Sequence, residues 1–288
     1  MRSGRRGFVG MLGAALACPV CTSLRAEPAA GAHGARWGYE GATGPAAWGK
    51  MSPANKACAI GMEQTPIDLK AAISAQLGAP SVAYTPTPLK ILNNGHTIQV
   101  NCAPGSKVEI SGTQYDLLQF HFHTPSEHKV NGKSAPMEVH FVHLKTGALP
   151  CDPDALLVIG AMIQQDSVTH KELSKIFNAQ NLPQDSTQPA VTITNFDLNK
   201  VLPKLDDSYR YAGSLTAPST FTNCTAQGGS IDDQLSADIF PENVQWVVLT
   251  KKIEMSKAQI KTFRSLFEEG NSRETQPLNG RTVYRVQH

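Results

Sequence analysis

The sequence predicts a single domain made mostly of β-strands, with a few short helices. From residue 37 to about residue 286, short apolar runs are separated by turns rich in Gly, Pro, Asn and Asp, a pattern typical of sheet proteins. The 288 residues suffice to bury a sizeable core, and no internal repeat divides the chain. One domain is therefore expected.

Six short apolar runs are the candidate strands of this domain. In chain order they are residues 96–101, 107–111, 117–124, 137–144, 156–164 and 245–249. Segments 167–180 and 256–269 have helical spacing, and Ser256 is in position to cap the second helix. The polar segment 226–243 begins with glycines and is expected to be an inserted surface loop.

Residues 1–26 are predicted to be an export signal, because arginines precede an apolar run that small residues follow. Arg5 and Arg6 with Phe8 resemble a twin-arginine signal, and an ordinary secretory signal is the alternative. Residues 27–36, rich in Ala and Gly, are expected to be a flexible leader. The mature protein is thus expected in the periplasm or otherwise exported.

Charge and hydropathy limit the partners of this protein. Lys and Arg number 26 and Asp and Glu 24, so the surface has no strong field to attract a polyanion, and nucleic acid is not an expected partner. Beyond the signal, no stretch reaches the roughly 18 apolar residues of a spanning helix, so no transmembrane segment is expected in the mature chain. The oligomeric state stays open, with a dimer among the options.

Four cysteines remain once the signal is set aside. An even number in an exported chain favours two disulfides, and three pairings are open. None of the four belongs to a pair spaced for a metal. Cys18, which lies within the predicted signal, is a weaker candidate for lipid attachment. The four remaining cysteines are Cys58, Cys102, Cys151 and Cys224.

Three histidines on two predicted strands are the candidate metal ligands. Alternate side chains of a strand share a face, so Gln119, His121 and His123 lie on one side of their strand. The same parity puts Glu138 and His140 on one face of the next candidate strand. If the two strands are neighbours, three imidazoles converge, which is the ligand number of a catalytic zinc that keeps one position for water.

Polar residues two positions before a histidine strengthen this interpretation. Gln119 and Glu138 both stand in that position, and metal-bound imidazoles usually donate their other ring proton to such groups. Two alternating histidines alone are weak evidence, because they also occur in cupins and by chance. His128 and His143 lack comparable support and are expected to be structural.

With these histidines, seven segments in the right order resemble the α-carbonic anhydrases. The likeness covers residues 37–286, nearly the whole mature chain. It implies a large, twisted, mainly antiparallel central sheet, with zinc held by three histidines at the floor of a conical cleft. It also implies the reversible hydration of carbon dioxide to bicarbonate and a proton. Besides the histidine-bearing segment, the likeness lies in residues 37–39, 64–67, 93–96, 213–216, 246 and 276–281.

The resemblance also implies a role for individual side chains. His96 matches the proton shuttle, and its unperturbed pKa of about 6.5 suits that task. Thr216 matches the threonine that contacts the zinc-bound solvent, and Glu127 matches the carboxylate that receives the proton of that hydroxyl. Asn94 and Gln99 match polar positions that line the cleft. Four apolar residues match the wall against which carbon dioxide rests, although without the family they would be assigned to the core: Val142, Val158, Leu215 and Trp246.

Departures from the family pattern concern the same loop and the cysteines. Ala217 follows Thr216 where animal members often have a second hydroxyl residue. The resemblance implies a disulfide between Cys58 and Cys224, although Cys224 stands several residues later than the matching cysteine of many bacterial members. The other pair would then be Cys102 with Cys151.

Two rival functions remain open on the sequence alone. A non-catalytic binding module on the same fold typically loses a zinc histidine, whereas this chain keeps all three. An esterase that uses the same zinc site is expected only as a side activity.

Overall fold

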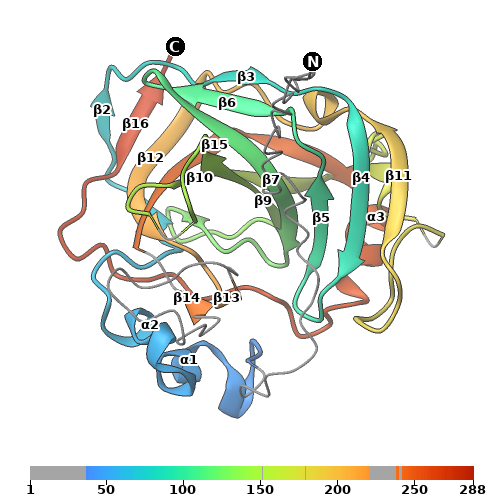
Figure 1. Cartoon of the computed structure of the whole chain (residues 1–288), viewed down its shortest axis with the longest axis horizontal. Coiled ribbons are helices and arrows are strands. Elements are labelled where there is room, and N and C mark those ends of the chain that lie inside the picture. The colour runs from blue at the N-terminus through green and yellow to red at the C-terminus, as the bar shows by residue number, and fades with distance from the viewer. Residues whose placement is uncertain (1–36, 151, 179, 221–237, 240–241) are drawn as a thin grey trace, which may run out of the picture. The chain divides into compact units, whose positions relative to one another are not determined.

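The computed structural model describes residues 37–150, 152–178, 180–220, 238–239 and 242–288. All of them belong to one compact unit. A twelve-stranded sheet forms its body (Figure 1). Its strands are β2 (Ile73–Ala75), β3 (Ser81–Ala83), β4 (Thr87–Asn93), β5 (Ile98–Cys102), β6 (Lys107–Ile110), β7 (Thr113–His123), β9 (Met137–Lys145), β10 (Leu156–Asp166), β11 (Val191–Phe196), β12 (Asp207–Ser214), β15 (Glu242–Ser256) and β16 (Tyr284–Gln287).

The sheet has the order β11-β4-β5-β7-β9-β10-β15-β12-β16-β2, and β6 joins β3 to β7. Most neighbours are antiparallel, and β10 with β15 and β16 with β2 are the parallel pairs of this sheet. Two small sheets pair β1 (Asp68–Leu69) with β8 (Lys129–Val130), and β13 (Ser219–Thr220) with β14 (Asp238–Ile239). The prediction of a mostly β fold on a large, mainly antiparallel sheet is confirmed, and each of the six candidate strands lies in or overlaps a strand.

The burial of each strand follows its place in the sheet. In β4, near one edge, buried side chains alternate with more exposed ones, as expected for a strand with one solvated face. In the central β10, the first eight residues are all buried, because both faces of the sheet are covered there. One face packs a cluster that includes Phe120, Phe141 and Phe263, and the other packs a cluster around Trp246.

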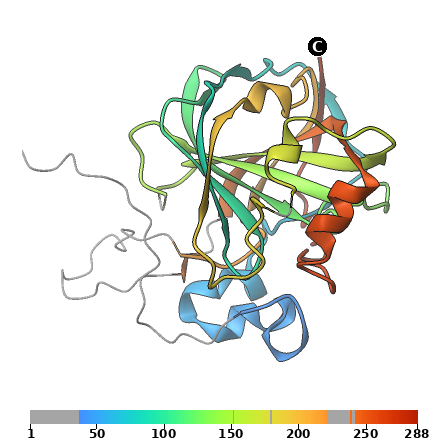
Figure 2. The same cartoon turned by 90° about the vertical axis from the view of Figure 1, so that its right-hand side faces the viewer.

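Helices are few among the described residues. Helices α1 (Pro45–Met51) and α2 (Ala57–Ile60) lie together below the sheet in Figures 1 and 2. Helix α3 (Lys257–Arg264) packs against β10 and β15. Ser256 caps α3 as predicted: its Oγ accepts from the backbone N–H of Gln259, and the Gln259 side chain accepts from the Ser256 backbone N–H. None of the helices in the described part of the chain is long and apolar enough to span a bilayer.

The helix predicted over residues 167–180 is wrong. The described residues of that segment form turns, with one 3-10 turn at Leu173–Lys175. Polar side chains bond to backbone carbonyls of the segment: Ser174 Oγ donates to His170 O, and Asn178 Nδ2 donates to Ser174 O. Such bonds compete with helix formation. Most of the predicted loop 226–243 lies outside the described residues.

Candidate metal centre

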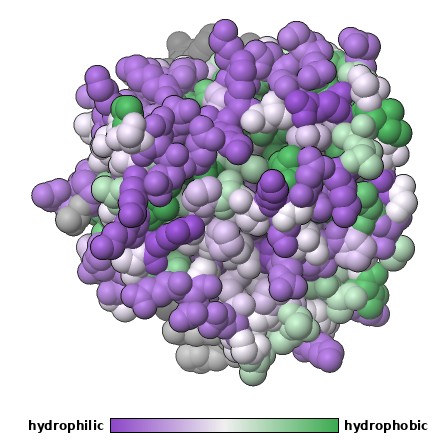
Figure 3. Space-filling model, turned by 180° about the vertical axis from the view of Figure 1, so that it is seen from behind, coloured by the Kyte–Doolittle hydropathy of each residue, from purple (hydrophilic) through white to green (hydrophobic). Residues whose placement is uncertain are grey.

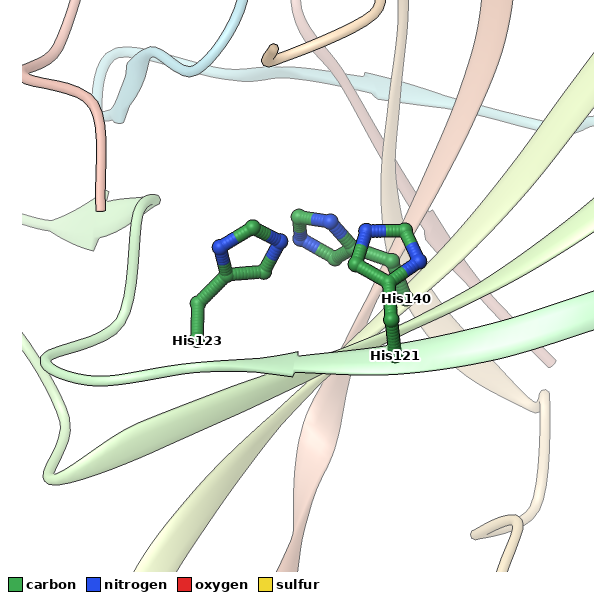
Figure 4. A group of neighbouring side chains, drawn as sticks. All are labelled: His121, His123 and His140. Carbon is green, nitrogen blue, oxygen red and sulfur yellow. The ribbon is translucent and has the colours of Figure 1, made fainter. Parts of the chain in front are cut away.

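Strands β7 and β9 are antiparallel neighbours, and their register brings the three candidate ligands together. His121 stands directly opposite His140, and His123 follows on the same face of β7. Ligand atoms of the three side chains all lie within 4.8 Å of one another. Figure 4 shows the imidazoles of His121 and His123 rising from one strand beside that of His140.

One nitrogen of each imidazole is fixed by a hydrogen bond, which leaves the other nitrogen for the centre. Nε2 of His123 is buried and has no hydrogen-bond partner, a costly state that a metal ion would relieve. The nitrogens that remain are thus Nε2 of His121, Nε2 of His123 and Nδ1 of His140. The fixed contacts are His121 Nδ1 to Gln119 Oε1 at 2.9 Å, His123 Nδ1 to Asn271 O at 2.8 Å and His140 Nε2 to Glu138 Oε1 at 3.0 Å.

Burial keeps the three histidines neutral. It lowers the pKa of His121 well below 6.5, with further lowering by His123 and His140. Burial also lowers the pKa of His123 to about 4 and lowers that of His140, although Glu138 opposes it for His140. Neutral imidazole is the form that binds metal, because a protonated ring has no free lone pair.

Glu138 is fully buried and supports His140 through a network that includes His128. Its Oε1 accepts from His140 Nε2 and from His128 Nδ1 at 2.7 Å, and its Oε2 accepts from the His128 backbone N–H at 2.9 Å. Burial would raise the pKa of Glu138, but the two histidines hold it well below its usual range. His128 Nε2 in turn lies 2.6 Å from the Tyr211 hydroxyl. His128, expected to be merely structural, therefore helps to orient a candidate ligand.

Glu127 and Thr216 lie together beside the histidines, although they are distant in sequence. Burial raises the pKa of Glu127 to about 7, although nearby His140, the backbone N–H of Arg273 and the Thr216 side chain all act to lower that pKa. Glu127 Oε2 lies 3.8 Å from His140 Nδ1. Thr216 is itself 5% exposed, so the pair sits at the wall of the centre rather than in solvent.

Two residues at this site carried no signal in the sequence. The backbone oxygen of Asn271 accepts from His123, and its side chain accepts from the Thr124 N–H and donates to His96 O. Arg273 donates its backbone N–H to Glu127 Oε1 at 2.9 Å. Both follow α3 in an irregular segment, where neither periodicity nor spacing indicates a partner.

The candidate shuttle His96 lies on the turn between β4 and β5, apart from the three clustered histidines. Its half-buried ring stacks on Trp37, with ring centroids 3.6 Å apart and planes inclined by 9°. Nearby, Asn94 Nδ2 donates to Gln99 Oε1 at 3.3 Å.

The four apolar residues of the predicted substrate wall belong to one cluster. Val142, Val158 and Trp246 are buried in it, and Leu215 packs against it. The Trp246 ring lies 4.9 Å from that of His140, edge to face, and its Nε1 donates to Ser214 O at 2.9 Å. An apolar surface therefore borders the histidines.

The described cysteines are Cys58 in α2 and Cys102 at the end of β5. Burial raises the pKa of Cys58 to about 11 and that of Cys102 to about 12, which makes both poor nucleophiles at neutral pH. Their predicted partners Cys224 and Cys151 lie outside the described residues, so both pairings stay predictions.

Known families and structures agree with this geometry. The family model of eukaryotic-type carbonic anhydrases matches residues 43–225 and 235–287. A carbonic anhydrase of Nostoc sp. is 37% identical over 286 residues, which cover 97% of this chain and 96% of that relative. The solved α-carbonic anhydrase of Thermovibrio ammonificans, in complex with the inhibitor sulfanilamide, has a TM-score of 0.74 and 37% identity over 87% of this chain and 99% of that chain.

The same fold also occurs in dioscorin, which was crystallised with a different ligand. The crystal structure of dioscorin complexed with ascorbate has a TM-score of 0.73 and 25% identity, and it covers 88% of this chain and 98% of that chain. The fold alone is therefore weaker evidence of function than the match to the family model together with the similar carbonic anhydrases. Because that model and those relatives match most of its length, this chain belongs to the eukaryotic-type, or α, carbonic anhydrase family and is a carbonic anhydrase.

Proposed function

We propose that this protein is a zinc enzyme that reversibly hydrates carbon dioxide to bicarbonate and a proton. The observation that carries the proposal is the convergence of His121, His123 and His140, each with one ring nitrogen fixed and the other left for the centre. Three neutral nitrogen ligands suit zinc with one open position. Zinc held in this way acts as a Lewis acid that makes water a nucleophile near neutral pH.

Thr216 and Glu127 would orient the attacking oxygen. In this arrangement the Glu127 carboxylate would accept a hydrogen bond from the Thr216 hydroxyl, which would leave the Thr216 oxygen free to accept a hydrogen bond from the reacting water. The Arg273 N–H holds Glu127 Oε1 in place for this task. The water then presents a lone pair, rather than its proton, to the substrate.

The apolar cluster beside the histidines suits carbon dioxide. Val142, Val158 and Trp246 are nearly fully buried, and Leu215 adds to the same surface. An apolar molecule rests there without desolvating any polar group, whereas bicarbonate, which is charged, is held poorly against such a wall. The wall thus favours binding of carbon dioxide and release of bicarbonate.

His96 would carry the proton between the site and buffer. Its ring is half-buried on the turn between β4 and β5. Stacking on Trp37 holds the ring in a defined orientation. An imidazole with a pKa near 6.5 accepts and releases protons readily at neutral pH.

A non-catalytic binding protein is the rival function, because the same fold occurs in dioscorin complexed with ascorbate. The full set of three histidines with Glu127 and Thr216 favours catalysis. The decisive experiment measures zinc content and stopped-flow hydration of carbon dioxide for the wild type and for His123→Ala. The variant should lose both, while the matched control His170→Ala, a histidine far from the three ligands in sequence and outside their cluster, should keep both. Full hydration activity without zinc would refute the proposal.

We also propose that the mature protein is exported and oxidised. The arginine-led signal over residues 1–26 and the even number of later cysteines support this. The proposed disulfides are Cys58 with Cys224 and Cys102 with Cys151. Peptide mapping of unreduced periplasmic protein would test both pairs.

A further inference from the structure

A cavity of about 420 Å³ lies where the β15 strand departs from β10, on the sheet face that carries the Trp246 cluster. Ala161 pairs with Leu249, but the next paired residues are Ile163 and Ile253. Met162 alone therefore faces the three residues 250–252 of β15. Such a bulge bends a strand and interrupts its hydrogen-bond ladder, which opens space between neighbouring elements.

The inner wall of this cavity is apolar. Met162 is 3% exposed and Ala135 is 8% exposed, and both belong to the cluster around Trp246. Val130 and the ring of Tyr209 pack against the same cluster. Because Met162 and Ala135 are already almost shielded from water, a ligand would displace water chiefly from Val130 and Tyr209, which is favourable in proportion to the apolar area covered.

The rim of the cavity is basic. Lys133, Lys252 and Arg285 line it, together with the hydroxyls of Ser134 and Thr250, and no acidic side chain does. Arg285 is partly neutralised, since its Nη2 donates to Asp207 Oδ2 at 2.7 Å. In the part of the chain that the structure describes, the exposed Lys133 and Lys252 form no ion pair with an acidic side chain. Figure 3 shows a mostly hydrophilic surface on the face it draws, whereas this cavity joins an apolar wall to cationic ends.

The three catalytic-site histidines do not line this cavity. A second cavity, of about 260 Å³, has lysines as well, but Glu172 and Glu254 line it beside Lys171 and Lys200. The charge of the lining therefore distinguishes the two cavities. The smaller cavity is lined by both acidic and basic side chains, whereas the larger one is lined by basic side chains and by no acidic ones. A volume of 420 Å³ falls within the range of small-molecule sites, roughly 300–1,000 Å³.

We propose that the cavity beside Met162 is a binding site for a small organic anion whose apolar body rests on Met162 and Tyr209 and whose charged group lies between Lys133 and Lys252. Carboxylates and sulfonates with an aromatic ring have this chemistry. The site is separate from the zinc centre, and it does not depend on the hydration reaction.

The test titrates the zinc-loaded protein with 8-anilino-1-naphthalenesulfonate, an aromatic sulfonate that fluoresces in apolar surroundings. Saturating sulfanilamide is present throughout to block the metal centre. Saturable binding at one site per chain is expected. The double variant Lys133→Ala/Lys252→Ala should weaken this binding at least about fivefold, because the charge contacts of two exposed lysines are lost. The matched control Lys171→Ala/Lys200→Ala removes the same charge from the mixed cavity and should bind like the wild type.

A second variant tests the volume rather than the charge. Ser134→Trp places a large side chain in the rim and should abolish saturable binding while hydration activity, which verifies folding, is unchanged. The proposal is overturned if no saturable binding occurs in the presence of sulfanilamide, if Ser134→Trp binds the probe like the wild type, or if both lysine pairs affect binding equally.

Discussion

His143 should make the stability of this protein fall as the pH drops from about 6.5 to about 4. The side chain is 0% exposed, and its two nitrogens are satisfied in the neutral form. Nδ1 lies 3.3 Å from Leu157 O, to which it donates, and Nε2 lies 2.7 Å from the Tyr84 hydroxyl, from which it accepts. A second ring proton on Nε2 would have to be accepted by that hydroxyl oxygen, and the Tyr84 hydroxyl proton would then lose its acceptor. Burial accordingly lowers the pKa of His143 from 6.5 to about 4.

The sign and size of the effect follow from proton linkage. Between pH 6.5 and about 4 the unfolded chain binds a proton at His143 that the folded protein does not, so acid favours unfolding. Above pH 6.5 His143 is neutral in both the folded and the unfolded state, so it no longer makes the free energy of unfolding depend on pH. At 1.36 kcal/mol per pKa unit, the loss amounts to about 3 kcal/mol by pH 4.

Urea unfolding of metal-free wild type and His143→Gln, measured from pH 4.5 to 7.5, isolates this contribution. Glutamine cannot take up a proton, so the variant should be less stable at pH 7.5 but should lose less stability in acid. The other histidines titrate in both proteins and cancel in the comparison. Tyr84→Phe is the control. It removes the 2.7 Å hydrogen bond to His143 but keeps the His143 imidazole buried, so the stability of this variant should still fall in acid. Equal slopes for wild type and His143→Gln would refute the reasoning.

Four more results are expected. His96→Ala should lower kcat in dilute buffer, spare kcat/KM and recover with added imidazole in stopped-flow assays; an unchanged kcat would assign the proton transfer to another group. Asn271→Ala should weaken zinc binding at least about tenfold in chelator competition, because the loop that fixes His123 loses its anchor, and wild-type affinity would contradict this. Arg210→Leu should raise the free energy of unfolding by about 1 kcal/mol in urea, because the buried Nη2 of Arg210 has no hydrogen-bond partner; a lower value would show that this guanidinium is compensated. Reduction should lower Tm, since a bridge from Cys58 to Cys224 is worth roughly 4 to 5 kcal/mol in the chain-entropy model, and an unchanged Tm would argue against the bridge.

Much of this site could be predicted because side chains alternate regularly between the two faces of a β-strand. With a period of two, the sequence alone placed His121 and His123 on one face, and Glu138 with His140 on another. The start of α3 was predictable for a similar reason, since Ser256 and Gln259 satisfy each other locally. Contacts between residues only a few positions apart could be predicted without knowing the fold.

The parts that could not be predicted depend on contacts between distant segments. Asn271 meets His123 across 148 positions, and its role follows from where an irregular segment passes rather than from any repeat. The helix expected over residues 167–180 failed because Ser174 and Asn178 bond to the backbone instead of facing solvent. The spacing of apolar residues shows neither which side chains compete for backbone hydrogen bonds nor where a distant segment will lie in the fold.

The contacts of Asn271 determine where the chain tolerates being cut. Its side chain joins the turn that carries His96 to the end of β7, and its backbone holds His123. A circular permutant opened next to Asn271 would free all of these contacts at once and should fold with a weakened metal centre. New termini at the exposed hairpin residues Asn131 and Gly132 would interrupt none of them. The segment after α3 is therefore a poor site for insertion or tagging, however much it resembles an ordinary surface loop.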